Sequence, residues 1–254
     1  MENLPRRQFN TGLLSSLFTF SLVETLSRNE LFARPIHAIA QKWLVEVEEA
    51  SQALRKQQIK PSEWQSKIAE IFVRVEQKDL LLAIDFDRLH KKLKLVGPQE
   101  AIIEVESKAQ KGLPPELSFD AMIYGMKKGA VIPPHCHRNM ASMHMPIGGA
   151  LHGWHFDRVA DEADHLIIKP TMDRSLTLGE VTTVSDDKDN VHWFQPTGEV
   201  AYMFNIAVFR IDRAQKVGGR QFYVDAAHGD KIDGDKLRVK KLSSEDAYKI
   251  YSKS

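Results

Sequence analysis

The feature that most constrains this chain is a long stretch, from about residue 113 to residue 225, in which short β-rich runs alternate with turn residues. Pro114 and Pro115 exclude a helix at its start. The β-rich runs cover residues 121–126, 150–158, 166–169, 180–184, 192–195, 201–211 and 221–224. Seven or more short strands with no helix between them are typical of a β-sandwich or a β-barrel. We therefore expect a mainly β domain here.

The segment before this stretch carries apolar residues at the three- and four-residue spacing of amphipathic helices. A Pro-Ser-Glu sequence at 61–63 marks the start of one helix. The apolar positions are Trp43, Leu44, Val47, Ala50, Trp64, Ile68, Ile71, Phe72, Leu82, Phe86 and Leu89. Because such helices are marginal alone, we expect a helical segment at 41–112 that packs on a β domain at 113–228. A polar C-terminal tail, 229–254, follows and ends in a short helix.

The first forty residues resemble a bacterial twin-arginine export signal. Residues 6–7 are an arginine pair, residues 12–23 form a mildly apolar run, and the sequence Ala-Ile-Ala at 38–40 offers a cleavage site. The apolar run is too short for a permanent membrane anchor. We expect residues 1–40 to direct the protein through the twin-arginine export machinery to the periplasm or the medium. The alternative is a cytoplasmic protein that begins with an amphipathic helix, because Glu24 is unusual inside an export signal.

Charge and cysteine content narrow the choice of partners. The chain carries 35 Lys and Arg residues against 34 Asp and Glu residues, a net charge of +1. This balance provides no bulk positive charge for nucleic acid or for an acidic membrane surface. The single cysteine, Cys136, excludes an intrachain disulfide. The sequence also contains no nucleophile elbow and no phosphate-binding glycine loop, so we expect a small-molecule partner and no nucleic acid.

The segment Gly129-Ala-Val-Ile-Pro-Pro-His135-Cys136-His137 carries the expected chemistry. Side chains two residues apart on a strand point to the same face, so His135 and His137 can reach one metal ion. Cys136 then faces the opposite side and is not expected to be a ligand. His192 follows a polar turn and opens an apolar strand, so it can bring a third imidazole from a neighbouring strand. Three imidazoles on one side of an ion leave open positions for a substrate and for O2.

This pattern resembles the motifs of the cupin superfamily. Gly129, followed after five residues by His135 and then His137, matches the first cupin motif, and His192 matches the histidine of the second. The resemblance implies a cupin-type double-stranded β-helix, or jelly-roll barrel, with an N-terminal helical segment. Many cupins add a glutamate four or five residues after the second histidine, but here Ala and Ser occupy 141–142. A three-histidine site without a carboxylate is similar to that of the thiol dioxygenases.

Within the cupins, four stretches in order resemble the branch of plant cysteine oxidases and 2-aminoethanethiol dioxygenase. They are the His-x-His motif with Gly149 twelve residues after His137, residues 149–159, residues 190–194 and residues 219–223. The resemblance spans roughly residues 119–225. It departs from the family at Asn205, where an acid is usual, and in the residues that surround the three histidines.

The resemblance implies a non-haem Fe(II) oxygenase that uses O2 to oxidise a small thiol to a sulfinate. Neutral imidazoles leave the full charge on the ion, which lowers the pKa of a bound thiol and holds it as a thiolate. Zn, Ni and Cu also suit imidazole ligands, and manganese cupins exist, so these metals are alternatives to iron. Two other functions stay open: a cupin that binds a metal or small ligand without turnover, and a metal-dependent isomerase or lyase. An exposed edge strand would favour a homodimer.

Further site residues follow from the resemblance and from strand alternation. His152 occupies a histidine position of the family, so we expect it to act in catalysis, facing the substrate. Because His155 is three residues further on, at most one of the two can point inward. His144 is expected on the opposite side of the barrel or in a turn. The remaining candidates are Tyr223 and Tyr202 as proton donors and Arg220 as a partner for a substrate carboxylate.

Overall fold

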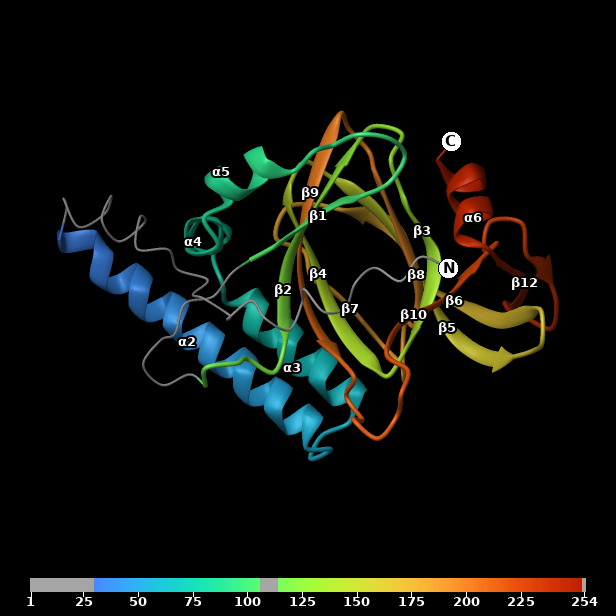
Figure 1. Cartoon of the computed structure of the whole chain (residues 1–254), viewed down its shortest axis with the longest axis horizontal. Helices are drawn as coiled ribbons and strands as arrows, with labels where there is room; N and C mark the ends of the chain where they lie inside the picture. The colour runs from blue at the N-terminus through green and yellow to red at the C-terminus, as the bar shows by residue number, and fades with distance from the viewer. Residues whose placement is uncertain (1–29, 106–113, 253–254) are drawn as a thin grey trace.

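The structure of the chain is a computed structural model that describes residues 30–105 and 114–252 (Figure 1). Of the predicted export signal at 1–40, residues 1–29 lie outside the described residues. The helices are α2 (Glu30–Arg55), α3 (Pro61–Val73), α4 (Gln77–Ala83), α5 (Phe86–Leu89), the 3-10 helix η1 (His90–Lys92) and α6 (Ser244–Tyr251). Within the described part of the chain, no helix combines the length and the apolar character needed to cross a membrane.

The strands form two sheets whose neighbouring strands pair in antiparallel fashion. The first sheet has the order β1 (Ala101–Glu104), β2 (Asp120–Lys127), β9 (Val200–Phe209), β4 (Met140–Gly148) and β7 (Thr182–Ser185). The second has the order β10 (Gly219–Val224), β3 (Ile132–Arg138), β8 (Val191–Pro196), β5 (Leu151–Asp161), β6 (His165–Leu176), β12 (Leu237–Leu242) and β11 (Asp230–Lys231).

The central strands β2 to β9 follow the order of a jelly roll. Strands β2-β9-β4-β7 form one side of the barrel and strands β3-β8-β5-β6 form the other. Most consecutive strands therefore alternate between the sheets, which closes them around one interior. The mainly β jelly-roll barrel with N-terminal helices that the sequence predicts is confirmed.

The N-terminal helices cover the outer face of the first sheet, where α3 packs against β4 and β7, and α2 packs against α3 (Figure 1). Helix α3 begins at Pro61, and the backbone N–H of Lys60 donates to the Glu63 carboxylate over 2.7 Å. Trp64 and Phe72 of α3 pack with Met143 of β4 in one apolar cluster. As a result β4 is buried on both faces, and only its other face lines the barrel interior.

Two strands lie where the sequence predicts other structure. Strand β1 falls inside the segment 41–112 that was expected to be helical, and Ile102 and Ile103 pair there with β2. Strand β12 falls inside the tail 229–254 and pairs with both β6 and β10. The sequence signal for β12 is weak because Val239 is its one fully buried residue among basic neighbours.

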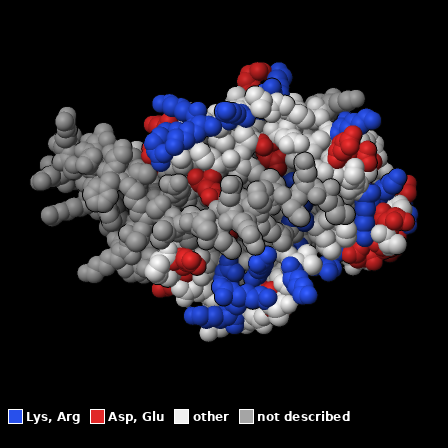
Figure 2. Space-filling model, in the orientation of Figure 1, with Lys and Arg blue, Asp and Glu red and all other residues white. Residues whose placement is uncertain are grey.

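The C-terminal elements cover the outer face of the second sheet, where α6 lies beside β3 and β10 (Figure 1). Cys136, Trp193 and Tyr248 belong to the apolar cluster beneath them. Figure 2 shows acidic and basic side chains mixed at this end of the molecule, where β5, β6 and β12 lie. Lys241 pairs with Asp161 over 2.6 Å there. Asp161 therefore forms an ion pair at the surface.

The barrel interior holds two apolar clusters with polar residues between them. One cluster is formed by Met126, Ala130, Ile132, Leu151, Leu176, Phe194, Ala201 and Met203. The other is formed by Met122, Met140 and Ala207. Along β9, Asn205 lies between Met203 of the first cluster and Ala207 of the second. Buried histidines converge at this position between the clusters.

Candidate metal centre

Three histidines from two neighbouring strands meet inside the barrel. His135 and His137 lie on β3, and His192 lies on β8 directly opposite His135 in the ladder. Their ring centroids are 4.4–5.0 Å apart, and one ligand atom from each lies within 4.8 Å of the others. Each of the three residues is buried, with at most 9% of its surface exposed. The structure thus brings together the three ligands that the sequence predicts, in a group that could hold one metal ion.

Backbone carbonyls orient two of these rings. A carbonyl oxygen only accepts hydrogen bonds, so the Nδ1 of His135 donates to the Pro133 carbonyl over 2.8 Å. In the same way the Nδ1 of His192 donates to the Asn190 carbonyl over 3.3 Å. Both rings therefore keep the Nε2 lone pair for a metal, the usual arrangement of ligating histidines. This donor set fits a divalent metal that accepts imidazole.

Burial keeps the three imidazoles neutral. Desolvation, with the nearby Arg220 guanidinium adding to it, lowers the pKa of His135 well below its ordinary value. Desolvation likewise lowers the pKa of His137 and brings the pKa of His192 down to about 3. A neutral imidazole has the free lone pair that metal binding requires. All three groups are therefore ready to bind a metal at neutral pH.

Two asparagines fix the ends of the ligand strands. The Nδ2 of Asn190 donates to the His137 carbonyl over 3.1 Å and to the Ser185 carbonyl over 2.9 Å. The backbone N–H of Asn139 donates to the Asp186 carboxylate over 2.6 Å. These bonds join the end of β3 to the β7–β8 turn, so they set the position of His137 relative to the strand that carries His192.

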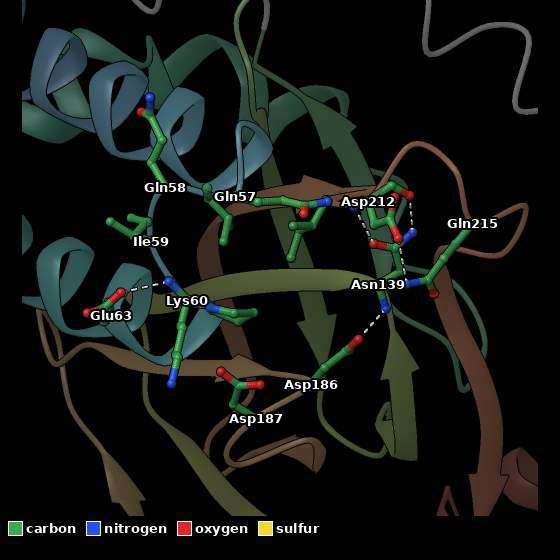
Figure 3. Close-up of a pocket in the computed structure, with 13 residues that line it drawn as sticks. Gln57, Gln58, Ile59, Lys60, Glu63, Asn139, Asp186, Asp187, Asp212 and Gln215 are labelled. Carbon is green, nitrogen blue, oxygen red and sulfur yellow. Dashed lines mark hydrogen bonds between the residues drawn. The ribbon is translucent and has the colours of Figure 1, made fainter.

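The same loops line a surface hollow of about 550 Å³, drawn in Figure 3. Asn139 is one of its lining residues and has a φ of +57°. The Asn139 side chain donates to the Asp212 carbonyl over 2.8 Å and accepts from the Asp212 N–H over 2.7 Å. Asp187 accepts hydrogen bonds from the N–H and hydroxyl of Ser62. The polar groups of this hollow therefore hold loops together beside the metal centre.

Arg220 and Tyr223, two of the candidate residues from the sequence, lie on β10 beside the triad. The ring of Tyr223 lies 6.2 Å from the ring of His135. Arg220 Nη1 donates to the Tyr223 hydroxyl over 2.6 Å, and Nη2 donates to Glu100 over 3.4 Å. The Tyr248 hydroxyl of α6 donates to the other Glu100 oxygen over 2.7 Å. No sequence signal pointed to Glu100, because it lies far in the chain from the arginine and the two tyrosines that surround it.

Tyr202, the other candidate proton donor, lies away from the centre. Its ring packs edge to face against Phe86 of α5, with centroids 5.3 Å apart, and lies 5.8 Å from His90. The side chain therefore faces the helices outside the first sheet. The expectation that it contacts a metal-bound ligand was wrong, because neighbouring positions of β9 face opposite sides.

His152 does not face the barrel interior, contrary to the sequence-based expectation. Its Nε2 lies 2.7 Å from the Asp173 carboxylate, and its ring lies 4.1 Å from that of Trp154 on the outer side of the sheet. His155 faces inward instead, is 2% exposed and lies opposite His192. Strand alternation correctly excluded one of the two. Leu151, four residues before His155 on the same face of β5, belongs to the interior apolar cluster, so this face is the inward one.

His144 also lies inside the barrel, although it was expected on the far side or in a turn. It comes from β4 of the first sheet, and its ring lies 5.2 Å from that of His192 and 4.9 Å from that of Phe194. Desolvation lowers the pKa of His144 and of His155. Two neutral imidazoles that the sequence did not assign to the site therefore flank the triad.

Cys136 faces away from all five histidines. It is fully buried in the cluster beneath α6, with Val191 and Trp193. Its neighbours on β3 point into the barrel, so the alternation of the strand separates the thiol from the metal centre.

The chain was compared with protein-family models, with curated proteins and with solved structures. No family model matches the chain, and no curated protein matches it. Similar solved structures include a recombinant oxalate oxidase in complex with glycolate, at 17% identity and a TM-score of 0.32. That match covers 44% of this chain and 52% of the oxidase chain, so it spans about half of that protein.

Two further solved structures are similar over about half of this chain. A sugar phosphate isomerase from a cupin superfamily, from Silicibacter pomeroyi, has 16% identity and a TM-score of 0.32, over 43% of this chain and 59% of that one. KdgF from Halomonas sp. has 16% identity and a TM-score of 0.33, over 50% of this chain and 94% of that one. Similarities this low carry no argument about reaction or substrate.

Proposed function

We propose that the protein is a metal-dependent oxygenase that holds Fe(II) on His135, His137 and His192 and oxidises a small thiol to a sulfinate. The observation that carries this proposal is the set of three neutral, buried imidazoles that contains no carboxylate. Such a set leaves the whole charge of a divalent ion to act on the ligands that complete its coordination. A thiol gains most from that charge because it binds as the thiolate.

The proposed reaction is balanced without a further reductant. A thiol R–SH and one O2 give the sulfinic acid R–SO2H, in which both oxygen atoms are bonded to sulfur. Sulfur loses four electrons and O2 gains them. A metal held by His135, His137 and His192 would supply Lewis-acid chemistry for a thiol and O2.

The protein's own residues hold and orient the substrate in this proposal. Arg220, tied to Glu100 and Tyr223, offers a guanidinium to a carboxylate or other anionic group of the thiol. Tyr223 lies next to His135 and can donate its hydroxyl proton to an oxygen atom near the metal. The apolar side chains at both ends of the interior exclude water from the reacting atoms.

Oxygen uptake by the iron-loaded full-length protein tests the proposal. The thiols are cysteamine, cysteine, 3-mercaptopropionate and a peptide with an N-terminal cysteine, and the sulfinate is identified by mass spectrometry. We expect uptake with at least one thiol, one O2 for each sulfinate, and loss of uptake in His192→Ala. His152→Ala is the matched control, because that histidine faces the outside. Bound iron without uptake from any thiol would overturn the proposal.

A binding protein without turnover is the second candidate. It is favoured by Asn205, a neutral amide at the position where the resembled family carries an acid. This function would give stoichiometric metal and tight ligand binding, with no sulfinate and no other product. An isomerase or lyase would form product equally well without O2, so anaerobic assays of the same preparation separate these alternatives.

A further inference from the structure

Besides the Nδ1 of His137 and the Oδ1 of Asn190, four buried polar atoms beside the triad lack a hydrogen-bond partner among the described residues. They are the Nδ1 of His144, the Nε2 of His155, the Oγ1 of Thr182 and the Oδ1 of Asn205. Asn205 and Thr182 are the direct partners of His144 on the two strands that flank β4. Direct partners on adjacent strands place their side chains on the same face of the sheet. Three of these atoms therefore belong to one row that faces His192.

The hydrogen bonds of Asn205 fix the orientation of its amide. Its Nδ2 donates to the Met143 carbonyl over 2.8 Å and to the Ser142 hydroxyl over 2.7 Å. A carbonyl only accepts, so the group next to Met143 must be the NH2. The Oδ1 of Asn205 is therefore a hydrogen-bond acceptor that no described residue satisfies.

Ser142 fixes the proton of His144 in the same way. The Ser142 hydroxyl lies 3.3 Å from the Ile206 carbonyl, which only accepts, so its one hydrogen is donated there. We assign the ring proton of His144 to Nε2, 3.5 Å from the Ser142 oxygen, because the hydroxyl hydrogen points to the Ile206 carbonyl. The other ring nitrogen, Nδ1, is buried without a partner among the described residues and is the lone-pair acceptor of this tautomer. The row thus presents two acceptors, His144 Nδ1 and Asn205 Oδ1.

We infer that His144 and Asn205 form a binding site, inside the barrel next to the metal, for a hydrogen-bond donor on the metal-bound ligand. The donor is a hydroxyl or an amine, because both fixed atoms accept hydrogen bonds. Buried acceptors without partners favour any ligand that satisfies them over a ligand of the same shape that does not. The inference deepens the proposed function, on whose metal centre it rests, by naming a second functional group of the ligand.

Matched pairs of ligands test this inference in the cobalt-loaded full-length protein without O2. One pair is 2-mercaptoethanol and 1-propanethiol, and the other is 3-hydroxypropionate and butyrate. In each pair a hydroxyl replaces a methyl group and the metal-binding end is unchanged. Cysteamine, with an ammonium in place of the hydroxyl, shows which donor is preferred. The visible spectrum of Co(II) gives the Kd of each ligand, and metal content is measured on the same samples.

We expect the hydroxyl compound to bind about tenfold more tightly than its partner in at least one pair, the effect of one hydrogen bond to a buried acceptor. His144→Phe removes one acceptor and keeps an aromatic ring, so the ratio should fall towards one. Ser142→Ala keeps His144 but releases its proton from Nε2, so the ratio should fall there as well. His152→Phe makes the same change on the outside of the sheet and should keep the ratio.

Equal affinities within each pair would overturn the acceptor site, and so would a preference that survives in both His144→Phe and Ser142→Ala. If either variant fails to fold, the other and the wild-type ratios still decide. Hydroxyl preference among the carboxylates without any thiol binding would keep the acceptor site and overturn the thiol proposal. Thiol binding without hydroxyl preference would overturn the acceptor site and leave the thiol proposal standing. Binding of no ligand at all to the cobalt protein would overturn both.

Discussion

His155 on β5 stands directly opposite His192 on β8, and the two rings meet edge to face with their centroids 5.8 Å apart. His144 approaches the same ring from the other sheet, at 5.2 Å. The third ligand of the triad is therefore held by side chains from both sheets. A ligand that is already fixed by packing needs little rearrangement when a metal binds.

Metal binding should stabilise the fold through the triad. At a free metal concentration of 100 times Kd, we expect the free energy of unfolding to rise by about 2.7 kcal/mol. Urea unfolding with and without Co(II) measures this change. His137→Ala should lose most of it, while His152→Ala should keep it because His152 lies outside the barrel. The same gain in His137→Ala would show that the metal binds elsewhere.

The sequence could predict the triad but not the histidines around it. The two-residue spacing of His135 and His137 fixes a common face within one strand, and the turn before His192 indicates a new strand. Alternation also shows that the side chains of His152 and His155 point to opposite faces of the sheet. It gives only relative orientation, however, and the inward side was decided by contacts of β5 with β6 and β8 that lie far apart in sequence.

His144 was harder to predict because β4 is covered on both faces. Helix α3 buries one side of the strand and the barrel interior buries the other, so residues 140–147 are all buried. Without alternation between apolar and polar positions, this run shows no strand period in the sequence. The series of short strands predicted a β-sandwich or β-barrel, and the resemblance of the histidine motifs implied the jelly roll. The facing of β4, by contrast, depended on a helix that lies about 70 residues earlier.

The metal-free protein should lose stability as the pH falls below about 6.5. Burial lowers the pKa of all five interior histidines, and that of His192 to about 3. The unfolded chain, with ordinary histidine pKa values near 6.5, therefore binds more protons than the folded chain in acid. Each such histidine contributes a slope of up to about 1.4 kcal/mol per pH unit, present as stability above pH 6.5 and lost on acidification.

Urea unfolding between pH 8 and pH 5 measures this slope. His155→Phe should reduce it, because it removes one buried imidazole and places an aromatic ring beside Phe194. His228→Phe, a change on an exposed residue, should leave the slope as it is. A wild-type free energy of unfolding that stays constant over this range would show that burial does not disfavour protonation of these histidines.

Cys136 should resist thiol reagents in the folded protein and take no part in metal binding. Burial raises the pKa of its thiol, and the residue has no exposed surface. We expect labelling by a disulfide reagent only in denaturant, where the thiol is free to ionise. Cys136→Ala should keep the metal stoichiometry of the wild type and lower stability by about 1 kcal/mol through lost packing. Loss of the metal in this variant would contradict the strand geometry.

Gly149, in the turn between β4 and β5, should tolerate no side chain. Its φ is +69°, and an added Cβ would collide with the Val200 carbonyl of β9. Gly179 has a similar φ of +81°, but a Cβ there meets nothing within 4 Å. Gly179→Ala should therefore cost only the backbone strain, about 1 kcal/mol. We expect Gly149→Ala to cost about 3 kcal/mol or more, because the turn must also move away from β9. Equal losses in urea unfolding would show that the turn yields freely, and the positions of Leu151 and His155 on the following strand would then not depend on it.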